Sequence, residues 1–145
     1  MSLDSAHSLV TKRLVIGHLT VCQGCCCGNT ENGRPPVPVD WLKKEWRARG
    51  LLRRVQLTIS GCLAPCDLPN VVTISNENGT QWLGEITEFE QYRALVDWAS
   101  RSRDAGELVP LPKEFSATYL ASIPQMNGAA PSANNYASHS VLTNW

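Results

Sequence analysis

The sequence predicts an α/β domain with the element order β-α-β-β-β-α, a mixed four-stranded sheet and a disordered C-terminal tail. Three observations support this prediction: short apolar runs typical of strands, two segments with apolar residues at helical spacing, and an Asn-Gly pair between two β-prone runs. At 145 residues the chain is about one domain long and can bury a core without disulfides. We place the domain at residues 11–112 and the tail at residues 113–145, since residues 116–145 hold no Lys, Arg, Asp or Glu.

The first half of the predicted domain is a strand, a loop and a helix. Residues 13–21 contain an apolar run rich in β-branched side chains, which predicts a buried strand. Residues 23–38 hold three glycines and three prolines and are expected to form a loop. The helix that follows is predicted to begin at Asp40, a typical N-cap residue, and to stop at Gly50.

The second half is predicted to contain three strands and a helix. From Val55 apolar residues alternate with polar ones, as in a strand exposed on one face. Residues 71–75 and 80–84 flank the Asn-Gly pair, which is a strong signal for a hairpin. The last helix is predicted to begin at Thr87, in a capping box with Glu90.

The composition excludes several classes of protein. Thirteen basic and thirteen acidic side chains cancel, so no global field draws the chain to nucleic acid or to anionic lipid. No segment approaches the ~20 apolar residues of a membrane span, and the first ten residues lack the apolar run of a signal peptide. We therefore expect a cytoplasmic protein. In that reducing compartment, clustered cysteines bind metal or do redox chemistry more often than they form structural disulfides.

Four of the six cysteines form two spaced pairs. Four residues separate Cys22 from Cys27, and three separate Cys62 from Cys66. Each pair follows one of the first two predicted strands. A right-handed β-α-β crossover makes those strands parallel, so both loops leave the same edge of the sheet and the thiols should converge. Four convergent thiolates suit either a [2Fe-2S] cluster or a structural zinc ion.

Two further cysteines, Cys25 and Cys26, exceed this four-ligand set. They are either small loop residues without a function, or alternative ligands or a redox-sensitive pair. Residues 22–25 also form a C-x-x-C motif, which is typical of thiol-disulfide oxidoreductases. In those proteins the second cysteine lies at the start of a helix, whereas a loop rich in glycine and proline follows here.

Three segments of the chain resemble one known family. They are VCQGCCCG, SGCLAPCDLPNVVTI and NGTQWLGEIT, and with the residues between them they cover about residues 19–100. This run resembles the thioredoxin-like [2Fe-2S] ferredoxins and the small cluster-bearing subunit of respiratory NADH dehydrogenase. A narrower resemblance, in CCCG, PPVPVDWLKKEW and LTISGC, is to a bacterial ferredoxin-like subgroup that accompanies cobalamin synthesis and cobalt insertion.

The resemblance implies a thioredoxin-like fold, a [2Fe-2S] cluster and the work of a one-electron carrier rather than an enzyme. Its implied ligands are Cys22, Cys27, Cys62 and Cys66, and Cys25 and Cys26 are the alternates for the second ligand. A zinc-stabilised four-cysteine binding module is the first alternative, although zinc sites usually have two residues within each ligand pair. A thiol-disulfide oxidoreductase is the second alternative.

The charges of the chain are unevenly distributed. Residues 39–54, the basic segment, hold four more basic than acidic side chains, and residues 77–107, the acidic segment, hold four more acidic than basic ones. Either these are solvated helix faces or they form a dipolar surface that orients a protein redox partner. We expect such a partner and neither nucleic acid nor a membrane. The sequence leaves a homodimer open.

Overall fold

The computed structural model describes residues 9–24, 26–63, 65 and 67–120. Cys25, Cys66 and residues 121–145 lie outside the described residues, and so do the predictions that concern them. Within the described part the order of elements is β-α-β-β-β-α, with three short 3₁₀ helices between and after them. The predicted element order is therefore confirmed.

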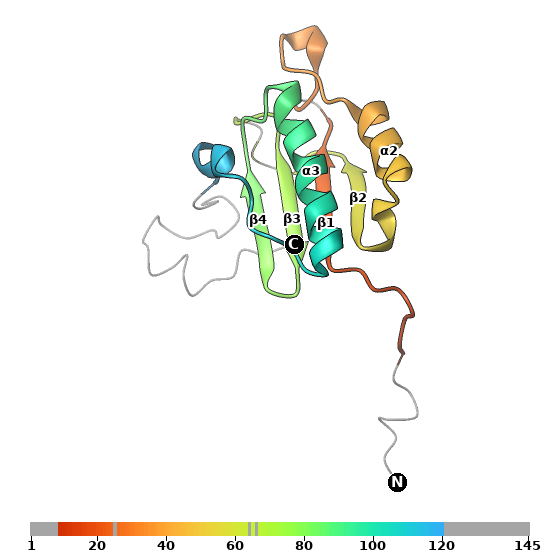
Figure 1. The fold of residues 1–145 in the computed structure, drawn as a ribbon. Helices are drawn as coiled ribbons and strands as arrows, with labels where there is room; N and C mark the ends of the chain where they lie inside the picture. Colours follow the sequence, from red (N-terminus) through yellow and green to blue (C-terminus); the bar gives the residue numbers. More distant parts are fainter. Residues whose placement is uncertain (1–8, 25, 64, 66, 121–145) are drawn as a thin grey trace.

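Four strands form one mixed sheet: β1 (Gly17–Cys22), β2 (Val55–Ser60), β3 (Val72–Asn76) and β4 (Gly79–Leu83). Their order across the sheet is β2-β1-β3-β4 (Figure 1). Strand β1 runs parallel to β2 and antiparallel to β3, and β4 runs antiparallel to β3. The predicted mixed four-stranded sheet is therefore confirmed.

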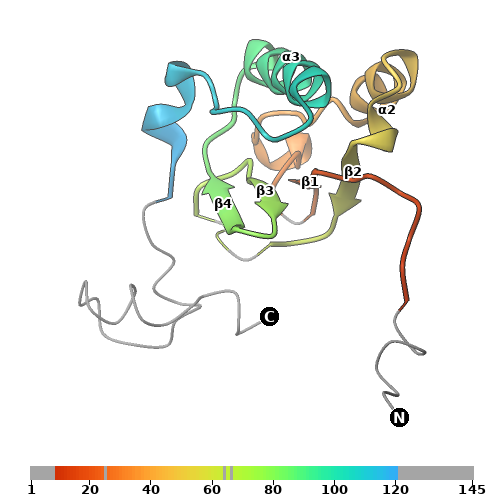
Figure 2. The ribbon, with the colours of Figure 1, turned by 60° about the horizontal axis from the view of Figure 1, so that its bottom comes forward.

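Helices α2 (Val39–Ala48) and α3 (Phe89–Ala105) lie on the same face of the sheet (Figure 2). Alternate strand residues turn toward them, among them Leu19 and Val21 on β1, and are fully buried. The largest fully buried side chains of the core between the helices and the sheet are Trp46, Trp98, Tyr92, Phe115, Leu19, Leu42, Leu51, Leu83, Ile86 and Leu95.

Among the described residues, no helix is both long enough and apolar enough to cross a membrane.

Several predicted boundaries are wrong by a few residues. Strand β1 begins at Gly17 and not at residue 13, because its parallel ladder with β2 starts only where Gly17 pairs with Val55. Asp40 is not the N-cap of α2, since the helix already starts at Val39 and Asp40 lies in its first turn. The predicted stop is confirmed, because Gly50 takes up the left-handed φ of 62° directly after the helix.

The start of α3 is also displaced by one residue. Glu88 is its N-cap, and the side chain of Gln91 accepts hydrogen bonds from the backbone N–H groups of Glu88 (2.8 Å) and Thr87 (2.9 Å). The predicted box of Thr87 and Glu90 is therefore wrong. The glutamine three residues after Glu88 reaches back to the free N–H groups, which the adjacent Glu90 does not do here.

The chain continues to pack on the domain after the predicted boundary at residue 112. Phe115, in the 3₁₀ helix η3 (Lys113–Thr118), is fully buried in the core. Beyond it the backbone runs along the edge of β4, where the N–H of Gly84 donates to the carbonyl of Thr118 (2.8 Å) and that of Leu120 to Trp82 (3.0 Å). Residues 113–120 thus belong to the packed part of the molecule.

Candidate cysteine site

The two cysteine loops start side by side at one edge of the sheet. Cys22 is the last residue of β1 and pairs in register with Ser60, the last residue of β2. The backbone then continues the contact between the loops, since the N–H of Gln23 donates to the carbonyl of Ser60 (2.9 Å). Parallel strands bring both loops to their common carboxyl edge, as the predicted crossover requires. Cys62 follows two residues after Ser60, within reach of the first loop.

Gly24 lies directly against the second cysteine loop. A Cβ atom built on Gly24 would lie 3.2 Å from the backbone nitrogen of Cys62 and 3.7 Å from its Cα. By contrast, a Cβ atom on Gly61 would meet nothing within 4 Å. A side chain at position 24 would therefore push the first loop away from Cys62, and glycine permits the contact.

Cys22 and Cys27 are both buried, with 2% and 3% of their surface exposed. Their thiols influence each other's ionisation. The thiol of Cys22 donates to the carbonyl of Gly61 (3.3 Å), and the backbone N–H of Val71 donates to the Sγ atom of Cys27 (3.3 Å). An N–H group aimed at sulfur stabilises negative charge there, which is what a ligating thiolate needs.

The electrostatics of the site connect three sulfur atoms. Burial raises the pKa of the Cys22 thiol to about 12, the hydrogen bond to Cys27 raises it as well, and a hydrogen bond from the backbone of Leu63 lowers it. Negative charge on Cys27 or Cys62 also opposes ionisation of Cys22. The proximity of these thiols thus disfavours several thiolates together unless a cation compensates them. A bound metal supplies that compensation and displaces the protons.

One side of the site is an apolar wall. Cys22, Cys27, Val71 and Trp82 form a buried cluster of their own, separate from the main core, and Leu63 and Leu120 pack against it. Cys62 is exposed on the opposite loop. A group held between these loops would be shielded from water on the wall side and reachable from solvent on the side of Cys62. Such partial shielding is typical of sites that exchange electrons with a partner.

Asn70 is a structural residue of the site that sequence reasoning missed. It is fully buried, and its Oδ1 atom accepts a hydrogen bond from the N–H of Gly28 (2.8 Å), the residue after Cys27. Its Nδ2 group lies within hydrogen-bonding distance of the carbonyls of Pro35 (3.1 Å) and Ile86 (3.2 Å). Asn70 therefore fastens the first cysteine loop to the segment before α3. The signal in the sequence that could have pointed to this role is the position of Asn70, a polar amide immediately before the apolar run of β3.

The structure brings Cys22, Cys27 and Cys62 to the same edge of the sheet. Cys26 is half-buried in the first loop, and Cys25 and Cys66 lie outside the described residues. Within the described ranges, no three His, Cys, Asp or Glu side chains are arranged so that they could hold a metal ion. The sulfur donors, the N–H group on Cys27 Sγ and the close approach at Gly24 fit a thiophilic group such as a [2Fe-2S] cluster or zinc. The four-ligand set stays a prediction.

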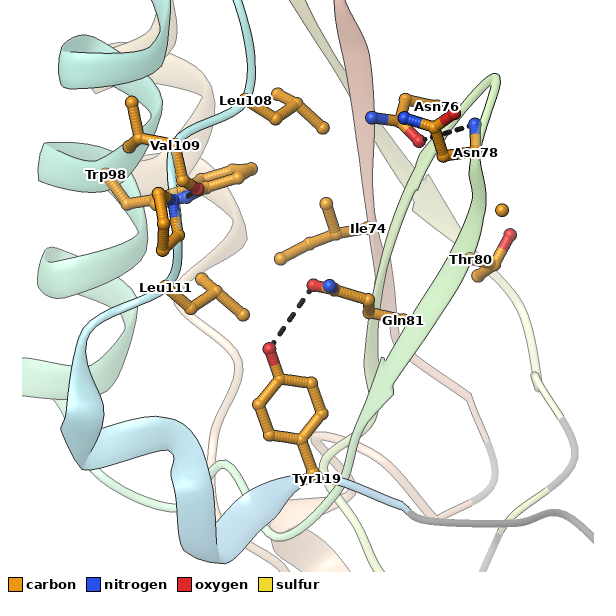
Figure 3. Close-up of a pocket in the computed structure, with 12 residues that line it drawn as sticks. Ile74, Asn76, Asn78, Thr80, Gln81, Trp98, Leu108, Val109, Leu111 and Tyr119 are labelled. Carbon is orange, nitrogen blue, oxygen red and sulfur yellow. Dashed lines mark hydrogen bonds between the residues drawn. The ribbon is translucent and has the colours of Figure 1, made fainter.

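Away from the cysteine loops, a cavity lies around the β3–β4 hairpin. It measures about 490 Å³, and Figure 3 shows apolar side chains of Ile74, Leu108 and Leu111 on its walls. The hydroxyl of Tyr119 is hydrogen-bonded to the side chain of Gln81 (3.4 Å) at its edge. The described residues of its lining include no cysteine, histidine, carboxylate, lysine or arginine. The described part of this cavity thus offers hydroxyl, amide and apolar groups, whereas the cysteine loops bring several thiols to one edge of the sheet.

Comparisons with known proteins give distant structural likenesses. The chain is similar to a thioredoxin-like [2Fe-2S] ferredoxin from Aquifex aeolicus, at 18% identity and a TM-score of 0.42, over 74% of this chain and 92% of that one. A variant of the same ferredoxin with one cysteine replaced by serine gives 16% identity and a TM-score of 0.42, over 74% of this chain and 100% of that one. No protein-family model matches the chain, and neither does any curated protein. Likenesses this distant carry no argument about function, which therefore depends on the chain's own residues.

Proposed function

We propose that the protein is a one-electron carrier that holds one [2Fe-2S] cluster on Cys22, Cys27, Cys62 and Cys66. The observation that supports this most directly is the meeting of two cysteine loops at the carboxyl edge of two parallel strands. When bound, the cluster would supply the chemistry of accepting and releasing a single electron. The cobalamin-associated role and the second ligand's identity stay predictions from the sequence.

The chain's own residues supply what such a carrier needs. A cluster of two ferric ions, two sulfides and four thiolates carries a charge of about −2, and about −3 when reduced. The N–H of Val71 on Cys27 Sγ offsets part of that charge. The wall of Val71 and Trp82 keeps water from one side, while exposed Cys62 marks the side open to a partner.

The partner that best suits this site is another redox protein. The electron has to leave through a surface close to the sulfur atoms, and the exposed loop of Cys62 provides such a surface. Weak, short-lived complexes of this kind are typical of electron carriers. A cytoplasmic location fits the proposal, because a reducing compartment keeps the thiols available as ligands.

A zinc-stabilised binding module is the second candidate. The specific observation in its favour is the all-sulfur donor set, which zinc also accepts. The two candidates differ in colour, iron content and redox behaviour, since zinc is colourless and takes no part in electron transfer.

Metal and sulfide analysis separates these candidates. Protein purified without oxygen should be brown and should contain about two iron atoms and about two acid-labile sulfides per chain. Colourless protein with one zinc per chain and no labile sulfide would establish the zinc module and refute the carrier. Purification of the Cys22→Ala variant beside the wild-type chain controls for iron bound elsewhere, because that variant should lose the colour.

A further inference from the structure

Four basic side chains surround one open cavity of about 560 Å³. Lys12, Arg13, Arg53 and Arg54 line it together with Leu14, and no carboxylate is among the described residues that line it. These residues precede the amino ends of β1 and β2, at the edge opposite the cysteine loops (Figure 1). The described lining of this cavity therefore carries only positive charge, in a chain whose net charge is zero.

The parallel pairing of β1 and β2 brings these cations together. Gly17 pairs with Val55, so the residues before each strand lie next to each other. The N–H of Ile16 donates to the carbonyl of Arg54 (2.7 Å), and the guanidinium of Arg54 donates to the carbonyl of Leu14 (3.4 Å). The backbone of the sheet thus fixes two basic pairs that lie forty residues apart in the sequence.

No acidic side chain neutralises this group within the described residues. The ion pairs found there belong to Arg49, Arg93 and Arg103, and none involves a residue of the basic cavity. Like charges held around one cavity repel one another, and an anion between them removes that repulsion. Three guanidinium groups also provide several forked donor pairs, the geometry that recognises phosphate oxygens.

We propose that this cavity binds a compact polyvalent anion of the oligophosphate class, either free or as the phosphate chain of a nucleotide. A di- or triphosphate brings several negative charges to the four positive ones, whereas a monovalent anion leaves most of the repulsion in place. Leu14, with 63% of its surface exposed, is the one apolar side chain of the lining, so the phosphates provide most of the affinity. The proposal is independent of the cluster at the opposite edge.

Titration of the full-length protein with sodium tripolyphosphate, followed by calorimetry, tests the proposal. Binding should be saturable, with one site per chain, and it should weaken as ionic strength rises. The double variant Arg13→Gln/Arg53→Gln should bind about tenfold more weakly or worse, because two charge-assisted contacts are lost. Arg54 is left unchanged, since its side chain also holds the backbone at Leu14.

The matched control is Lys43→Gln/Lys44→Gln, which removes two exposed cations from α2 and should leave the affinity unchanged. ATP in place of tripolyphosphate distinguishes the two sources: tighter binding of ATP indicates a nucleotide, and equal binding indicates the phosphates alone. Circular dichroism verifies that each variant is folded. Failure of tripolyphosphate to bind, equal loss in the control, or binding of a single-stranded oligonucleotide without tripolyphosphate binding would overturn the proposal.

Discussion

The two edges of the β1–β2 pair have opposite chemistry although the same strand register builds both. At the carboxyl edge, Cys22 and Cys27 are buried and the two cysteine loops meet at Gly24. At the amino edge, four cations line an open cavity. Parallel pairing makes residues distant in sequence converge at both edges, and the residue types in the loops determine what converges. Substitutions at one edge should therefore leave the structure and binding at the other edge unaffected.

The largest effect is expected from removal of a predicted ligand. Replacement of Cys22, Cys62 or Cys66 with alanine should abolish retention of the cluster, because three thiolates must find a poorer fourth ligand. Cys26→Ala should be milder. Absorption of the anaerobically purified variants measures the loss. A full-strength cluster in Cys27→Ala, together with its loss in Cys26→Ala, would show that the second ligand is misassigned.

Replacement of Asn70 should have the next largest effect, on stability as well as on the site. Asn70→Ala should lower the free energy of unfolding by about 3 kcal/mol, because it leaves several buried polar groups without a partner. Denaturant unfolding measures this change. Asn32→Ala removes an exposed amide and serves as the control, with little expected change. Equal stability of the two variants would show that Asn70 does not fasten the loop.

The contact between the cysteine loops can be tested by substituting Gly24 in the first loop and Gly61 in the second. Gly24→Ala should reduce cluster occupancy and stability, by about 1 kcal/mol for the latter, because its Cβ atom would lie 3.2 Å from the nitrogen of Cys62. Gly61→Ala adds the same methyl group where nothing lies within 4 Å, so it should cause little change. Similar iron content in both variants would contradict the packing described for this edge.

The smallest expected effect concerns the docking of a partner. Lys43→Glu/Lys44→Glu on α2 should slow electron transfer to the cognate partner a few-fold, about 2–10 times, and raised salt should do the same. Lys12→Glu/Arg13→Glu makes the same charge change at the amino edge and should leave the rate unaltered. Arg49 is unsuited to this test, since it pairs with Glu45 (3.2 Å) and Asp97 (2.9 Å) and joins the basic and acidic segments. If stopped-flow rates change neither with the reversal of charge on α2 nor with raised salt, the basic face of α2 is a solvated helix face and not a docking surface.

Local patterns in the sequence were sufficient to predict the order of elements and the convergence of the cysteine loops at one edge of the sheet. The Asn-Gly pair marks the β3–β4 hairpin, and the strand periods place both loops at one edge. The cap at Thr87 was wrong because the neighbouring Glu88 takes the N-cap position, and the cap at Asp40 was wrong because α2 starts one residue earlier, after Pro38, without a side-chain cap. Local signals of similar strength cannot separate such neighbours.

Features that depend on distant segments could not be predicted. Asn70 contacts two distant segments, the first cysteine loop and the segment before α3, and nothing in its own neighbourhood reveals them. Phe115 lies in a segment without a sustained period, so its burial depends entirely on tertiary packing. The basic cavity combines residues 12–13 with residues 53–54, which become neighbours only when the parallel strands pair.

Electron paramagnetic resonance of the reduced protein tests the central claim most directly. Reduction of two ferric ions by one electron leaves an odd number of electrons, so a [2Fe-2S] cluster becomes paramagnetic. Protein purified without oxygen and treated with dithionite should show a signal that integrates to about one unpaired spin per chain. The Cys62→Ala variant should lack this signal. A protein that stays silent before and after reduction, and contains zinc in place of iron, would contradict the account.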